Sequence, residues 1–250
     1  MKRALVYTIM FAAIQFLAGG VATLVVELLN GDSTSATGLI VSSATASIVA
    51  VIIFLAARWT VVSRHWIQTR PWFVLFWCVM AALGILVPST WLQEQMPELP
   101  NIAEEAFDTI MKDRMGYFII GLLAPLSEEM VFRGAVLKSL LQWKQNPWVG
   151  IVISAILFAL IHMNPVQMPH AFLVGLLLGW MYYRTDSIIP GVVYHWVNNT
   201  VAYVMYNLYP DPDMTLLDLF GSQRAILMAL VFSLCIFLPS LYQLNMRLKK

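Results

Sequence analysis

Eight apolar segments of about 20 residues run almost from one end of this chain to the other. Each is long enough to cross a bilayer as an α-helix. Hydrophobic residues make up 60% of the chain and charged residues only 12%, against about 25% charged residues in a soluble domain. The sequence therefore predicts an all-α, polytopic integral membrane protein with about eight transmembrane helices. The predicted spans cover about 4–29, 37–57, 71–92, 115–141, 147–163, 166–183, 188–208 and 223–246.

The charges between these segments predict an orientation, because Lys and Arg collect on the cytoplasmic side of a membrane. With the N-terminus inside, the inner loops and ends hold most of the basic residues: Lys2, Arg3, Arg58, Arg64, Arg70, Lys138, Lys144, Arg184, Arg247, Lys249 and Lys250. The outer loops hold most of the acidic residues: Asp32, Glu94, Glu98, Glu104, Glu105, Asp108, Asp113, Asp211, Asp213 and Asp218. Both termini are therefore predicted to be cytoplasmic. The net charge of +1 predicts no nucleic-acid partner.

We divide the single membrane domain into three parts. Residues 1–114 form three spans and an acidic outer loop, residues 115–208 form a catalytic core of four spans, and residues 209–250 hold the last span. An amphipathic run at 102–111 either lies on the membrane surface or is a solvated connecting helix. The two cysteines lie in apolar runs and are interpreted as buried hydrophobic side chains.

Two acids and an arginine lie deep inside the fourth segment, at Glu128, Glu129 and Arg133. Each charge at the centre of a membrane helix costs roughly 2.5–3.5 kcal/mol, so such residues usually have a function. At about 100° per residue, Glu129 and Arg133 share a helix face and are spaced for an ion pair, whereas Glu128 points elsewhere. One acid is then neutralised and the other is left free to act as a general base. Pro125 predicts a kink or a fresh helix start just before them.

Two other segments carry histidines among apolar residues. The fifth ends with Phe158 to His162, and the seventh carries His195 and Asn199, which are four residues apart and share a face. His170 is interpreted as structural, or as water-facing near a helix end. For His162 to reach the depth of Glu128, the fifth helix must tilt, start deeper, or end inside the protein under a re-entrant loop.

Several other protease chemistries are excluded by their missing motifs. The sequence has no H-E-x-x-H zinc helix, no aspartate deep in a span and no G-x-S-x-G nucleophile elbow. Ser127 lies next to the two acids, but a neighbouring carboxylate does not activate a serine as a histidine does.

The order Glu128-Glu129…Arg133, Phe158…His162 and His195…Asn199 resembles the CPBP family of CAAX-type endopeptidases and bacteriocin-processing or self-immunity proteins. The resemblance covers about residues 122–203 and implies an intramembrane endopeptidase acting on a membrane-associated or lipidated substrate. It implies that Glu128 and His162 activate a water molecule and that His195 and Asn199 stabilise the oxyanion. Glu129 and Arg133 would support the fourth span.

The resemblance also leaves the cofactor open, because the family is widely described as metalloproteases. Glu128, His162 and His195 form a plausible zinc set with an open position. A water molecule held directly by Glu128 and His162 fits the same residues, and we favour this metal-free interpretation. Two non-enzymatic alternatives are a transporter or immunity factor that binds an ion or ligand at the polar cluster, and a purely structural polar core.

Overall fold

The computed structural model describes residues 1–29, 31–63, 66, 71–143, 145–211 and 214–248. In these ranges all regular secondary structure is helical, as predicted from the sequence. Several charged residues used for the orientation lie outside the described residues: Arg64, Arg70, Lys144, Asp213, Lys249 and Lys250.

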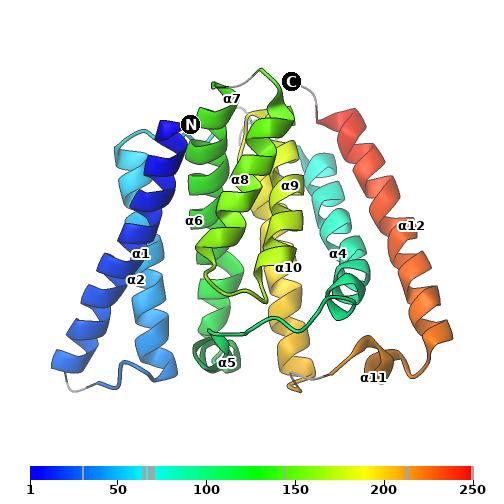
Figure 1. Cartoon of the computed structure of the whole chain (residues 1–250), viewed down its shortest axis with the longest axis horizontal. Helices are drawn as coiled ribbons and strands as arrows, with labels where there is room; N and C mark the ends of the chain where they lie inside the picture. The colour runs from blue at the N-terminus through cyan, green and yellow to red at the C-terminus, as the bar shows by residue number, and fades with distance from the viewer. Residues whose placement is uncertain (30, 64–65, 67–70, 144, 212–213, 249–250) are drawn as a thin grey trace.

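Two helix pairs flank a central group of helices (Figure 1). On one flank α1 (Lys2–Leu28) packs along α2 (Ala36–Ala56), and on the other α4 (Trp72–Glu94) packs along α12 (Gln223–Arg247). Gly84 lets α4 and α12 approach closely, since a Cβ there would lie 2.7 Å from the backbone nitrogen of Phe237.

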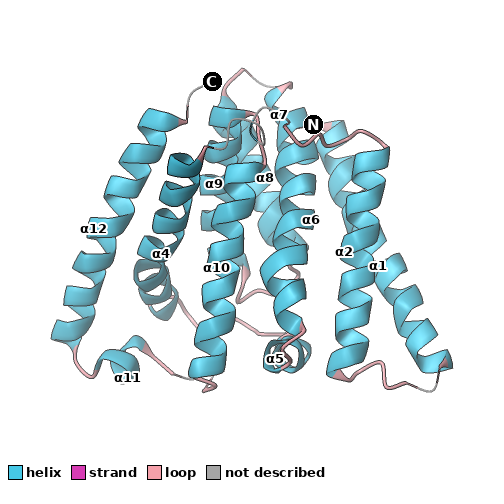
Figure 2. Ribbon diagram, turned by 180° about the vertical axis from the view of Figure 1, so that it is seen from behind, coloured by secondary structure: helices cyan, strands magenta, loops and turns pink. Residues whose placement is uncertain are grey.

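The central group carries the predicted motifs. It contains α6 (Ala124–Val131) between two π-helical segments, η1 (Phe118–Leu123) and η2 (Phe132–Leu137), followed by α7 (Lys138–Leu141). It also contains α8 (Pro147–Ile161), α9 (Met168–Thr185) and α10 (Ile189–Leu208). Seen from behind, α6 and α10 stand side by side in the middle of the molecule (Figure 2).

Prolines and polar caps mark the starts of several helices. Pro147 and Pro190 both lie in the first turn of their helices, where a missing N–H costs little. Asn146 caps α8 by accepting the backbone N–H of Trp148 at 3.0 Å. Two short helices lie between the long ones: α5 (Glu104–Lys112), which is the predicted amphipathic run, and α11 (Leu216–Phe220).

Four described helices are long and apolar enough to cross a membrane by themselves: α1, α2, α4 and α12. The protein is therefore a multi-pass membrane protein, but the predicted count of eight spans is not confirmed. Two of the central segments fall short for different physical reasons. With 15 residues α8 is too short, and the fourth segment is divided by its π-helical turns and carries four charged residues.

Candidate active site

The two glutamates lie on a short α-helix with a π-helical turn at each end. Pro125 occupies the first turn of α6, directly after the wide turn of η1, so its missing N–H falls at a point where the helix changes its pitch. The backbone stays helical through this point, so a change of pitch takes the place of the predicted kink or fresh start. Such π-helical turns are frequent at functional sites.

Glu129 and Arg133 form the ion pair predicted from their spacing. The Arg133 Nη1 donates to Glu129 Oε1 at 2.8 Å, and both side chains are fully buried. The second guanidinium nitrogen donates to the Gly175 carbonyl on α9 at 3.4 Å, and the guanidinium carbon lies 4.3 Å from the centre of the Phe158 ring. The arginine thus joins α6 to α9 and α8 in addition to neutralising the acid.

His195 on α10 lies between the two glutamates. Its Nδ1 is 3.2 Å from Glu129 Oε1, and its Nε2 is 3.8 Å from Glu128 Oε2. A carboxylate oxygen only accepts, so the Nδ1 carries a hydrogen and Glu129 fixes the orientation of the ring. The longer distance to Glu128 exceeds that of a direct hydrogen bond.

The two adjacent glutamates therefore have different surroundings. The Glu129 side chain is completely buried, whereas the Glu128 side chain is 19% exposed and lines the central cavity. One neutralised and one free carboxylate were predicted from the sequence. The surroundings of Glu129 and Glu128 agree with that prediction.

His162 follows directly after the last residue of α8. Its Nδ1 lies 2.8 Å from the Phe158 carbonyl oxygen. Because a carbonyl only accepts, Nδ1 carries a hydrogen, and in the neutral ring the Nε2 lone pair is left to accept. The Phe158 ring contacts both imidazoles edge-on, with its centre 5.0 Å from that of His162 and 5.8 Å from that of His195.

The loop after His162 turns back inside the protein, because α8 ends well above the lower end of the bundle (Figure 1). Asn164, which is almost completely buried, accepts from the Ile102 backbone N–H at 3.1 Å and donates to Asn101 Oδ1 at 2.8 Å. The connection between α4 and α5 thus holds this loop in place. A re-entrant end was one of the three arrangements predicted to bring His162 to the depth of Glu128.

Asn199 belongs to a hydrogen-bonded set that the sequence analysis did not assemble. Its Nδ2 donates to the Ile120 carbonyl in η1 at 2.9 Å, and its Oδ1 accepts from Asn198 Nδ2 at 3.3 Å. The same Asn198 nitrogen lies 3.4 Å from His170 Nε2. His170 was interpreted as structural or as water-facing near a helix end, and this contact was not predicted from the sequence. Asn198 is three residues from His195. This spacing could have indicated from the sequence that Asn198 lies on the same side of the helix.

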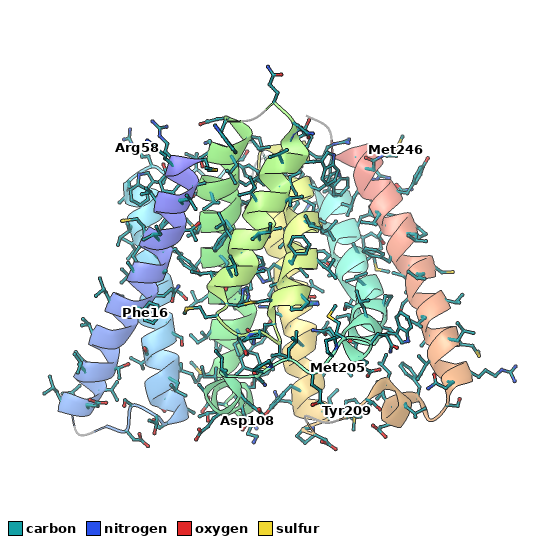
Figure 3. The ribbon with its side chains drawn as sticks, in the orientation of Figure 1. Phe16, Arg58, Asp108, Met205, Tyr209 and Met246 are labelled. Atoms are coloured by element: carbon teal, nitrogen blue, oxygen red, sulfur yellow. The ribbon has the colours of Figure 1, made fainter. Side chains whose placement is uncertain are left out.

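One cavity of about 910 Å³ has the four predicted catalytic residues in its lining. Glu128, His162, His195 and Asn199 all line it, while Glu129 and Arg133 lie behind its wall. It continues along α10 to Met205 and Tyr209, which lie near the lower end of that helix in Figure 3. Most of its lining is apolar. The apolar lining residues include Leu86, Val87, Val174, Val201, Leu216, Leu219 and Phe220.

The predicted zinc set is not assembled in this arrangement. Within the described ranges, no three His, Cys, Asp or Glu side chains gather closely enough to hold a metal ion. The geometry therefore gives no support to a resident metal, and the metal-dependent alternative stays a prediction.

Fold and site together define a multi-pass helical membrane protein with Glu, His and Asn side chains along one cavity. Residues 112–201 match the sequence model of the type II CAAX prenyl endopeptidase Rce1-like family. The chain is also 26% identical over 155 residues to UPF0177 protein YxdF of Lactococcus lactis subsp. lactis (strain IL1403), covering 58% of this chain and 80% of that protein. No solved structure matches the chain. The resemblance to CAAX-type endopeptidases seen in the three motifs is confirmed.

Proposed function

We propose that this protein is an intramembrane endopeptidase that hydrolyses a peptide bond of a membrane-associated or lipidated substrate. The observation that carries the proposal is the contrast between the two adjacent acids. Glu129 is buried and paired with Arg133, whereas Glu128 faces a cavity that is also lined by His162, His195 and Asn199. A purely structural polar core would not need an accessible carboxylate beside a large cavity.

In the proposed reaction, a water molecule in the cavity is held by Glu128 and by the free Nε2 of His162. One of these groups takes a proton as the water oxygen bonds to the scissile carbonyl carbon. The carbonyl oxygen becomes an oxyanion in the tetrahedral intermediate. The carbon–nitrogen bond then breaks, and the same proton passes to the leaving amine.

His195 and Asn199 are proposed to donate hydrogen bonds to the oxyanion. Since the Nδ1–H of His195 is directed at Glu129, the ring donates from Nε2 only when both nitrogens carry hydrogens. Asn199 has one amide N–H on the Ile120 carbonyl and a second N–H available for the oxyanion.

The test is cleavage of internally quenched fluorescent peptides by the purified full-length protein in liposomes. Half of the peptides carry a prenylated cysteine three residues before the C-terminus, and half carry none. The Glu128→Gln variant should lose roughly 10²–10⁴-fold in kcat, because a general base contributes about that much. Glu105→Gln is the matched control, since Glu105 is an exposed acid in the first turn of α5.

Two results would contradict the proposal. One is normal cleavage by Glu128→Gln. The other is no cleavage of any peptide by the unmodified protein, which would favour a non-catalytic ligand-binding or immunity protein instead.

Metal content is tested separately on the active protein. We expect less than one equivalent of any transition metal, and activity that survives prolonged treatment with a chelator, because the described side chains do not form a metal set. Activity lost with the chelator and restored by Zn²⁺ would establish the metal-dependent alternative.

A further inference from the structure

Three polar side chains and one backbone carbonyl form a hydrogen-bonded chain along the wall of the cavity. It runs from His170 on α9 to Asn198 and Asn199 on α10, and ends at the Ile120 carbonyl in η1. The three side chains all line the cavity. The reaction proposed above uses only Asn199, so the other two have no assigned role.

The direction of this chain is fixed by its last member. The Ile120 carbonyl can only accept, so Asn199 must present its Nδ2 to it, at 2.9 Å. The Asn199 Oδ1 then faces Asn198 at 3.3 Å and requires a donor, which makes the atom of Asn198 at that point the amide nitrogen. No other assignment of the two amides avoids placing two acceptors against each other.

The same reasoning reaches His170. The Asn198 Nδ2 has two hydrogens, and the second is directed at the His170 Nε2 at 3.4 Å. That ring nitrogen must therefore be an acceptor, and the hydrogen of the neutral ring must be on Nδ1. If Nε2 gained a proton, an N–H would face an N–H, and the chain would break at one of its links.

We propose that His170 and Asn198 are positioning residues that hold the Asn199 amide with its free N–H directed at the oxyanion, and that His170 does so only as the neutral Nδ1–H tautomer. The proposal rests on the oxyanion role assigned to Asn199 under the proposed function. An amide free to rotate by 180° would present an oxygen to the oxyanion for part of the time, so locking its orientation favours catalysis.

The groups around His170 belong to three other elements. His162 at the end of α8 and His195 on α10 are close enough to interact with it electrostatically, and Glu128 on α6 lines the same cavity. A change in activity with pH therefore has four titrating groups as possible sources, and a variant of His170 is needed to separate them.

The first experiment compares variants in the peptide-cleavage assay. Asn198→Asp puts an acceptor against Asn199 Oδ1 and should lower kcat roughly 10²–10³-fold, about the effect of removing an oxyanion donor, with little change in KM. Asn207→Asp is the matched control, because Asn207 lies on the same helix and bonds the Met111 carbonyl outside the cavity. Equal kcat for the Asn198→Asp variant and the control would overturn the proposal.

The second comparison tests the acceptor role of His170. His170→Phe removes the acceptor and should lower kcat, whereas His170→Gln supplies an amide oxygen and should recover most of the loss. As the pH is lowered, the unmodified protein should lose activity in a step of its pH profile that is absent from the pH profile of His170→Gln. A similar loss in the Phe and Gln variants, with normal thermal unfolding, would contradict the acceptor role.

A third measurement does not depend on proteolysis. The chain has four histidines, so the ring nitrogens can be followed by NMR in the full-length protein labelled with ¹⁵N-histidine, with His170 assigned from its Gln variant. The expected signal is a neutral ring protonated at Nδ1. An Nε2–H or doubly protonated ring at neutral pH overturns the proposal even if peptides are cleaved, whereas absent cleavage with the expected tautomer contradicts only the protease function.

Discussion

At the scale of single residues, the site depends on the Glu129 carboxylate, which contacts Arg133 and His195 and lies next to Gly191. Glu129 Oε1 accepts from Arg133 at 2.8 Å and lies 3.2 Å from the His195 Nδ1. Its other oxygen is buried without a hydrogen-bond partner among the described residues, next to Gly191. The spacing along one helix predicted the ion pair, because i to i+4 contacts are local. It could not predict His195 as a second partner, because that contact joins residues 66 positions apart.

Gly191 is predicted to be essential because of this close approach. A Cβ at this position would lie 2.7 Å from Glu129 Oε2, and the carboxylate cannot move away without breaking its contacts to Arg133 and His195. Gly191→Ala should therefore lower peptide cleavage at least tenfold, a loss of about 1.4 kcal/mol in transition-state stabilisation.

The matched control is Gly20→Ala on α1, where a Cβ would meet nothing within 4 Å. This variant should keep full activity and unfold at the same or a higher temperature, since Ala favours a helix over Gly by about 1 kcal/mol. Equal activity of the two variants would show that the contact at Gly191 is not restrictive.

At the scale of elements, the π-helical turns on either side of α6 are contacted by side chains from other parts of the chain. Ser154 on α8 donates to the Phe132 carbonyl at 3.1 Å and Asn199 to the Ile120 carbonyl at 2.9 Å, while Thr60 donates to the Met130 carbonyl at the end of α6 itself. These bonds tie the widened turns to neighbouring elements. They hold the helix that carries both acids in one position.

Ser154→Ala is predicted to lower the free energy of unfolding by about 1 kcal/mol, the usual net value of a hydrogen bond, because its buried hydroxyl joins α8 to η2. Chemical denaturation in mild detergent would measure the change. Ser139→Ala is a suitable control, because the Ser139 hydroxyl bonds only the Val136 carbonyl of its own helical segment. A smaller effect at Ser154 than at Ser139 would argue against this tie.

The helix boundaries show what hydropathy can and cannot predict. The segment expected at 147–163 is the helix Pro147–Ile161, and the one at 223–246 is Gln223–Arg247, because lipid or core contact favours apolar residues along a whole helix. The π-helical turns, the re-entrant loop after His162 and the pairing of His170 with Asn198 were not specified by periodicity. Each depends on contacts between segments far apart in sequence, which a local pattern does not encode.

At the scale of the whole molecule, the two ends of the bundle have different charges. The start of α1 and the end of α12 lie at the same end, where Figure 3 also shows Arg58 and Met246. Asp108 and Tyr209 lie at the opposite end. This arrangement supports an even number of passes, and we propose that the end with both termini is cytoplasmic.

Cysteine labelling in intact bacterial cells would test this orientation. With Cys78 and Cys235 replaced by alanine, a membrane-impermeant maleimide should label Glu105→Cys and should leave Ala57→Cys unlabelled until the cells are opened. Both positions are exposed, so accessibility within the protein does not distinguish them. The reverse pattern would invert the proposed topology.

The hydrogen bonds of Asn164 join segments of the chain that are synthesised at different times. Its partner Ile102 precedes it by 62 residues and so leaves the ribosome first, while the amides of α10 emerge after both. Glu128, the proposed general base, is therefore synthesised well before the groups proposed to stabilise the oxyanion.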